Sequence, residues 1–232
     1  MTILGTVLST AKHVALLGAV CAAALPAAAQ TPAAVPAKIR VACVGDSITQ
    51  GVFVDQSVRW TTVLQSDLGP RYDVENYGVS GTTLIKSGDS PYWKQPALAQ
   101  AITFQPNIVL IMLGTNDSKP QNLPAHPGEF QPDLKALIAQ FTALPTHPKV
   151  WLVQPIPVVA DGLAGITEPV LAGTIRPAIR QVAQQTKCQV IDLVPLLAPH
   201  PEDSLDHVHP NPAGHKIIGD AVAAALQGKK SN

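Results

Sequence analysis

Ser47 lies just beyond the end of an apolar run, a position from which a serine hydroxyl can act as a nucleophile. The run covers residues 41–44 and ends at Gly45 and Asp46, and its continuous apolar character is typical of a strand covered on both faces. The carboxyl end of such a strand lies at the edge where open α/β sheets bind ligands. Asp46 and Ser47 are also favoured capping residues, so this stretch alone does not distinguish a nucleophile from a cap.

His209, near the C-terminus, is the best candidate for a base that activates Ser47. A serine hydroxyl is a weak nucleophile until a nearby base takes its proton, and imidazole can accept a proton near neutral pH. Asp206 precedes His209 by three residues, close enough within a turn for its carboxylate to bind the second ring nitrogen and fix the tautomer. We expect these three residues to form a catalytic triad, with His207 pointing elsewhere.

Acyl transfer also needs hydrogen-bond donors for the negative charge that develops on the substrate oxygen. The backbone N–H groups of Ser47 and Gly81 and the side-chain amide of Asn116 could supply them. We therefore expect an oxyanion hole built from Ser47, Gly81 and Asn116.

Apolar runs and helical periodicities alternate along the chain, and this alternation must position these residues. The patterns predict strands at 41–44, 72–77, 108–113, 150–154 and 189–193, and helices at 59–68, 97–104, 130–144, 169–186 and 212–226, the last capped by Asn211. Such alternation implies an α/β fold with helices on both faces of a parallel sheet, and five strands favour a flavodoxin-like doubly wound arrangement. The loops that carry the candidate residues would then meet at one sheet edge.

Four short blocks, in this order, resemble those of the SGNH, or GDSL-type, hydrolases. They begin at Gly45, Gly78, Gly114 and Asp206 and read GDSIT, GVSG, GTND and DHVHPN. The resemblance implies a three-layer α/β/α sandwich and a serine ester hydrolase. It also implies Ser47 as nucleophile, Gly81 and Asn116 as oxyanion donors, and Asp206 with His209 as the rest of the triad. His207 stands where the family commonly has glycine.

Residues 86–94 and 116–121 resemble the corresponding segments of exported GDSL-type proteins grouped with sialate and other carbohydrate O-acetylesterases. The rings of Tyr92 and Trp93 could stack on sugars, although Trp93 could equally pack its loop onto the domain. Three further residues are candidates for substrate binding: Asp46, which is also expected to support the turn of Ser47, Lys119 and His207. Asp117 and Lys119 could both shape the site, although solvated loop charge is the favoured interpretation of each.

Together these features predict a secreted serine esterase that removes acetyl or other small acyl groups from small-molecule or polysaccharide carbohydrate esters, through an acyl-enzyme intermediate. Aromatic residues make up only 4% of the chain and no long apolar insertion is present, so no acyl-chain tunnel is indicated. Two alternatives stay open: a lysophospholipase- or thioesterase-type lipid acyl hydrolase, and a non-catalytic sugar-binding protein on the same fold.

Residues 1–29 have the features of a secretory signal peptide. Lys12 precedes an apolar run at 14–25, and small residues permit cleavage after Ala29. We expect a linker at 30–37, one hydrolase domain at 38–228 and a tail at 229–232. The predicted location is extracellular or periplasmic, with no membrane insertion after the signal is removed.

The remaining composition excludes several other classes of function. Without the signal peptide the chain carries 15 basic and 16 acidic residues, so nothing attracts nucleic acid. No cofactor is expected, and the spacing of His207, His209 and His215 matches no standard zinc site. Cys43 and Cys188 are the only cysteines of the mature chain; a disulfide between them stays open, although free thiols are favoured.

Overall fold

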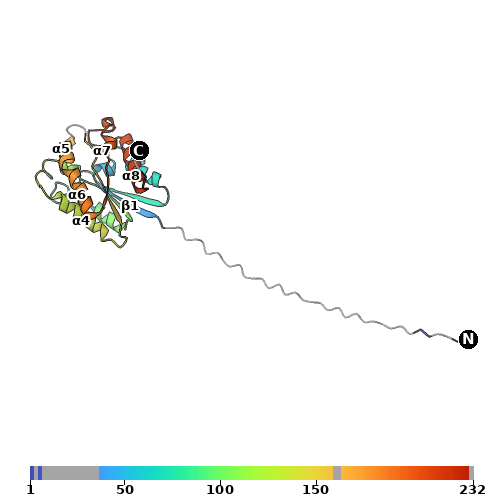
Figure 1. Ribbon diagram of the computed structural model, residues 1–232. Coiled ribbons are helices and arrows are strands. Elements are labelled where there is room, and N and C mark those ends of the chain that lie inside the picture. The colour runs from blue at the N-terminus through green and yellow to red at the C-terminus, as the bar shows by residue number, and fades with distance from the viewer. Residues whose placement is uncertain (3–4, 7–36, 159–162, 230–232) are drawn as a thin grey trace. The chain divides into compact units, whose positions relative to one another are not determined.

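Five parallel strands form the sheet at the centre of the structure, a computed structural model (Figure 1). The strands are β1 (Ile39–Gly45), β2 (Tyr72–Gly78), β3 (Ile108–Met112), β4 (Lys149–Val153) and β5 (Gln189–Ile191). Their order across the sheet is β2-β1-β3-β4-β5. This is the order of flavodoxin-like sheets, so the predicted doubly wound, five-stranded α/β fold is confirmed.

The structure describes residues 1–2, 5–6, 37–158 and 163–229. Most of the expected signal peptide, including its cleavage site, the linker up to residue 36, and residues 230–232 of the expected tail lie outside these residues. The chain from Ala37 onward forms one compact unit. None of the helices in the described residues has both the length and the hydropathy that a membrane span requires.

Alternating side chains of the central strands bury both faces of the sheet, since successive residues of a strand point to opposite sides. In β1, Val41 and Cys43 pack against α2 (Trp60–Leu68) and α8 (Pro212–Leu226). Ala42 and Val44 belong to the core on the opposite face, together with residues of α3 (Pro96–Thr103), α4 (Phe130–Thr142) and α6 (Arg176–Thr186). Figure 1 shows α4 and α6 on one side of the sheet and α8 on the other, which gives the three layers expected.

The long helices lie where the periodicity predicts them, and several short elements were not predicted. These are α1 (Ser47–Gln50), α5 (Glu168–Val170), α7 (Val194–Leu197), the 3₁₀-helices η1 (Gln56–Val58), η2 (Tyr92–Lys94), η3 (Asn116–Ser118), η4 (Leu163–Gly165) and η6 (Pro201–Asp203), and the π-helix η5 (Leu171–Ile175). The expected helix at 169–186 is therefore divided into α5, η5 and α6. Pro177 in the first turn of α6 lacks the N–H that a continuous α-helix requires, which accounts for the wider turn before it.

The N-terminus of α8 forms as the sequence predicts. The Asn211 side chain accepts the backbone N–H of Gly214 at 3.0 Å, and Pro212 occupies the first turn. Because this cap fixes where α8 begins, it also fixes the end of the preceding loop, which carries Asp206 and His209.

Both cysteines of the described residues are free thiols. Cys43 is buried in β1 and Cys188 is half-buried just before β5. Burial raises the pKa of the Cys43 thiol, and the nearby charge of Glu75 adds to the shift. Cys43 is therefore a small apolar core residue rather than a reactive thiol.

Candidate active site

Ser47 is held at the carboxyl end of β1 by a tight turn. Asp46 caps α1, because its Oδ1 accepts the N–H of Ile48 at 3.0 Å. A side chain at Gly45 would lie 2.8 Å from the carbonyl oxygen of Met112 and closer still to Thr49, so only glycine fits there. As the first residue of α1, Ser47 keeps a backbone N–H with no partner inside the helix. Both roles considered for this stretch are thus present: Asp46 is the cap, and the Ser47 hydroxyl contacts His209.

Three residues from opposite ends of the chain form a hydrogen-bonded trio. The distance from Ser47 Oγ to His209 Nε2 is 2.8 Å, and the distance from His209 Nδ1 to Asp206 Oδ2 is 2.7 Å. Ser47 is 5% exposed and His209 is 7% exposed, so the contact is largely screened from water. This arrangement lets the imidazole receive a proton from the hydroxyl while Asp206 fixes the ring.

Asp206 is built into the turn that carries His209. Its Oδ1 accepts the backbone N–H groups of His209 at 2.8 Å and Val208 at 3.1 Å. Partial burial opposes ionisation of this carboxyl, but the hydrogen bonds and the charge of His209 outweigh it and lower its pKa. His207 has a φ of 71°, in the left-handed region that glycine adopts more readily, and its side chain is exposed. This conformation explains why the related blocks commonly have glycine there.

The three candidate oxyanion donors lie on the adjoining turns. Gly81 has a φ of +79°, and a side chain built on it would meet nothing within 4 Å, so the backbone conformation rather than space requires glycine. The Asn116 amide donates to the carbonyl oxygen of Thr82 at 3.1 Å. A primary amide carries two N–H groups, which leaves the second one for another acceptor. The contact to Thr82 therefore ties Asn116 to the turn of Gly81.

Asp117 is a buried link between the same two turns. It is 0% exposed, and its two carboxylate oxygens accept the N–H groups of Leu84 and Ile85, each at 2.9 Å. Burial raises its pKa to about 7, with the hydrogen bonds opposing the shift and the charge of Asp46 adding to it. Burial likewise raises the pKa of Asp46 to about 6. Solvated loop charge was the favoured expectation for Asp117, and its complete burial shows that this was wrong.

Two of the five residues expected to bind substrate are buried. Tyr92 is 0% exposed and donates its hydroxyl hydrogen to the carbonyl oxygen of Tyr77 at 2.6 Å, so its ring cannot stack on a sugar. Asp46 is also 0% exposed and acts within its own turn. Both expectations are corrected, because hydrogen bonds within the protein draw these side chains into the core.

The other three residues lie nearer the surface. Trp93 is half-buried, its indole N–H donates to the carbonyl oxygen of Leu84 at 2.7 Å, and the Lys86 ammonium lies 4.3 Å from the centre of its ring. Packing of its own loop, the alternative considered for Trp93, therefore accounts for its contacts. The Lys119 ammonium lies 4.0 Å from Asp89, and His207 is exposed beside the trio.

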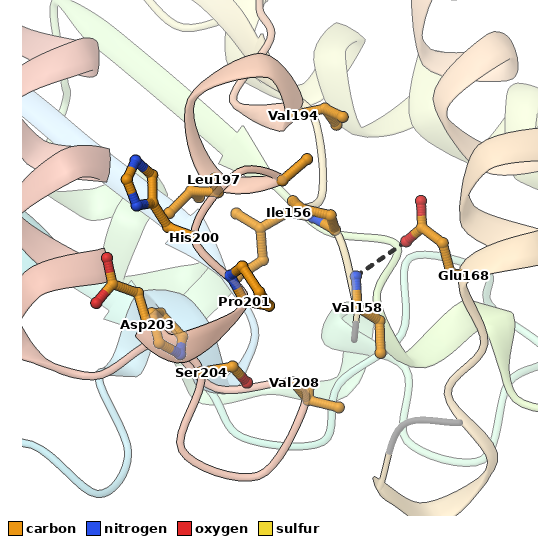
Figure 2. A pocket seen from close by; sticks show the side chains of 13 residues that line it. Ile156, Val158, Glu168, Val194, Leu197, His200, Pro201, Asp203, Ser204 and Val208 are labelled. Atoms are coloured by element: carbon orange, nitrogen blue, oxygen red, sulfur yellow. Dashed lines mark hydrogen bonds between the residues drawn. The ribbon is translucent and has the colours of Figure 1, made fainter. Parts of the chain in front are cut away.

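A pocket of about 310 Å³ adjoins the loop that carries His209, because Ser204, Val208 and Pro210 are among its lining residues (Figure 2). Its lining is mainly apolar and includes Ile156, Leu197 and Val208. Glu168 accepts the N–H of Val158 at 2.9 Å at its border. Neither Ser47 nor His209 is among its lining residues, so this pocket is separate from the trio.

Sequence reasoning overlooked Phe53, which the structure places against the trio. The rings of Phe53 and His209 meet edge to face with 5.2 Å between their centroids, and Phe53 is 71% exposed. Only one signal in the sequence points to it: Phe53 follows Gly51 by two residues, in the turn that begins at Ser47. Apolar character alone predicts the opposite, a core position.

Comparisons with known proteins agree with this architecture. An acetylxylan esterase from Xylanibacter ruminicola is 36% identical over 209 residues, which cover 82% of this chain and 43% of the relative. The chain thus spans less than half the length of that protein.

Solved structures share the fold. An aryl esterase from M. smegmatis superposes with a TM-score of 0.65 at 23% identity, covering 84% of this chain and 100% of its own. A carbohydrate acetylesterase from Sinorhizobium meliloti superposes with a TM-score of 0.65 at 20% identity, covering 82% and 99%. Residues 43–217 match the sequence profile described as the GDSL-like Lipase/Acylhydrolase family. This chain belongs to that family.

Proposed function

We propose that this protein is a serine esterase that removes acetyl or other small acyl groups from carbohydrate esters. The observation that carries the proposal is the hydrogen-bonded trio, with 2.8 Å from Ser47 to His209 and 2.7 Å from His209 to Asp206. A nucleophile in contact with a base that is oriented by a third group is the arrangement that covalent acyl transfer requires.

In the first half of the reaction Ser47 becomes acylated. Its Oγ attacks the ester carbonyl carbon while His209 Nε2 takes the hydroxyl proton, and Asp206 stabilises the imidazolium that forms. When the tetrahedral intermediate collapses, the ester C–O bond breaks and His209 returns the proton to the leaving alcohol oxygen. The lowered pKa of Asp206 suits this role, because the carboxylate must stay ionised beside the ring.

In the second half a water molecule replaces the alcohol. His209 takes a proton from this water, whose oxygen attacks the acyl carbon, and the proton then passes to Ser47 Oγ as the carboxylic acid leaves. The N–H groups of Ser47 and Gly81 and the free N–H of Asn116 stabilise the oxyanion in both halves. One such donor contributes about 3–4 kcal/mol of transition-state stabilisation.

The relatives support a carbohydrate ester as substrate. The relative quoted above is an acetylxylan esterase, and one structural neighbour is a carbohydrate acetylesterase. The features of residues 1–29 support export to the compartment where such polymers are found. The substrate and the location are both part of the proposal.

The direct test measures acetate released by residues 30–232 from acetylated xylan, other acetylated polysaccharides and acetylated sialic acid. We expect release from at least one carbohydrate ester, and Ser47→Ala is the matched control that must abolish it. Release by Ser47→Ala at the wild-type rate would contradict the mechanism. A series of p-nitrophenyl esters tests the acyl group: a preference for octanoate over acetate would indicate a lipid acyl hydrolase instead.

A further inference from the structure

Phe53 is an exposed aromatic side chain at the trio. Within residues 37–158 and 163–229, the large hydrophobic side chains that are exposed are Phe53, at 71%, and Leu205, at 50%. Both are connected to His209: Phe53 contacts its ring, and Leu205 donates its backbone N–H to the His209 carbonyl oxygen at 2.7 Å. Both exposed apolar residues thus lie on segments that contact His209, and the side chain of Phe53 contacts its ring.

Phe53 has a backbone conformation that is unfavourable for a bulky side chain. Its φ is 67°, in the left-handed region, which is rare and strained for a bulky residue. The turn is fixed from its start, because the N–H groups of Gly51 and Val52 both donate to the carbonyl oxygen of Ser47, at 2.9 and 3.2 Å. A strained residue whose ring stays in water contributes little to the core, and such outliers tend to mark functional sites.

The chemistry of the trio determines which part of a substrate would meet this ring. His209 must deliver its proton to the leaving alcohol oxygen, so the alcohol portion of the ester lies beside the imidazole. The acyl oxygen lies instead toward Gly81 and Asn116. A group attached to the leaving oxygen therefore extends toward whatever adjoins His209, and Phe53 adjoins it at 5.2 Å.

We propose that Phe53 is a stacking platform for the alcohol portion of the substrate, and that it selects alcohols with a flat or ring-shaped apolar face. This inference rests on the proposed ester hydrolysis and specifies its leaving-group side. The C–H face of a pyranose and the face of an aryl ring both pack on a phenyl ring, because contact removes apolar surface from water. Phe53 thereby supplies the sugar contact that buried Tyr92 cannot provide.

Benzyl acetate and methyl phenylacetate provide a sharp test, because they are isomers that carry the same ring on the alcohol side and on the acyl side. Methyl acetate is the substrate control without a ring. In Phe53→Ala we expect kcat/KM for benzyl acetate to fall about fivefold to tenfold, mainly through KM, since aromatic contacts contribute on that scale. We expect methyl acetate and methyl phenylacetate to change by less than about twofold. An acetylated methyl xylopyranoside should respond as benzyl acetate does.

Two variants serve as matched controls. Phe53→Tyr keeps the ring face and should retain the selectivity for benzyl acetate. Leu205→Ala removes the other exposed apolar side chain and should not abolish the preference for benzyl over methyl acetate. Thermal unfolding of each variant checks that the fold is intact.

Three outcomes would overturn the proposal. An equal loss of kcat/KM with all three esters, together with a shifted pH profile, would mean that Phe53 only supports the His209 ring. A loss confined to methyl phenylacetate would place the ring on the acyl side. If wild type shows no Ser47-dependent hydrolysis of any of these esters, the proposed function itself fails, and the platform fails with it.

Discussion

Asp206 and Asp117 each accept two backbone N–H groups at the same edge of the sheet, yet their surroundings shift their pKa values in opposite directions. Asp206 accepts the N–H groups of Val208 and His209, and its side chain is 24% exposed. Asp117 accepts those of Leu84 and Ile85 and is 0% exposed. Burial is the dominant effect at Asp117 and raises its pKa, whereas at Asp206 the contacts with His209 outweigh it.

The difference separates two tasks of a carboxyl group in one site. Asp206 has an ionisable partner, His209, at 2.7 Å and stays charged where the imidazolium forms. Asp117 has backbone partners in place of a cation and joins the turn of Asn116 to the segment that follows Gly81. We therefore interpret Asp206 as part of the reaction and Asp117 as a positioning residue for the oxyanion donors.

Removing members of the trio should have the largest effect. We expect Ser47→Ala and His209→Ala to lower kcat for an acetyl ester by about 10⁶-fold, and Asp206→Asn by about 10⁴-fold, because the three act as one unit. Steady-state kinetics with p-nitrophenyl acetate measure this. Near wild-type turnover in His209→Ala would contradict the assignment of Asp206 and His209 to the reaction.

Asn116→Ala should come next. Loss of one oxyanion donor lowers kcat by about 10²- to 10³-fold. KM should change little, because the donor acts on charge that develops only in the transition state. The same kinetic assay separates the two constants, and a change in KM alone would assign Asn116 to substrate binding instead.

Asp117→Asn should have a smaller effect on the reaction and a larger one on stability. An amide accepts only through its oxygen, so one buried N–H of Leu84 or Ile85 loses its acceptor, which costs about 1–3 kcal/mol of unfolding free energy. We expect kcat to fall about tenfold as the oxyanion donors lose their alignment.

Asp133→Asn is the matched control for this variant. Asp133 accepts the N–H of Lys86 at 2.8 Å and so holds the same segment farther along the chain. Its amide replacement should leave kcat closer to wild type than Asp117→Asn does. Equal losses of kcat in both variants would mean that the segment needs general support rather than the specific link at Asp117.

The smallest predicted effect is on the pH dependence of stability. Folding raises the pKa of Asp117 from 3.8 to about 7, so the folded state retains a proton that the unfolded state releases. The contribution of this raised pKa to the free energy of unfolding is complete below about pH 4 and is lost as pH rises toward about 7. Urea unfolding at a series of pH values should therefore show wild type losing more than about 1 kcal/mol relative to Asp117→Asn across this window. Asp46 shifts in the same direction but is present in both proteins, so parallel pH curves would contradict the raised pKa.

The sequence predicts the sheet and the residues of the trio because both depend on local patterns. Apolar runs mark the strands, and the carboxyl ends of parallel strands must share an edge. The same logic predicts that Ser47 and His209 meet, although they are separated by 162 residues.

Local sequence patterns do not reveal which side chains of the connecting segments are buried. Tyr92 and Asp117 are buried through hydrogen bonds to residues far along the chain, the Tyr77 carbonyl and the Leu84 N–H among them. Phe53 is exposed because its turn is tied to the carbonyl of Ser47, a geometry that apolar character alone does not reveal. Pairings between distant loops therefore determine which polar and aromatic residues reach a substrate.

The proposed esterase mechanism depends on an acyl-enzyme on Ser47, and rapid-quench mass spectrometry detects this intermediate most directly. Wild-type protein is mixed with p-nitrophenyl acetate, quenched in acid within the first turnovers and digested. We expect one added acetyl group on the peptide that contains Ser47, and none on that peptide in Ser47→Ala. Steady hydrolysis with no acetyl group on Ser47, or with the acetyl group on another residue, would contradict it.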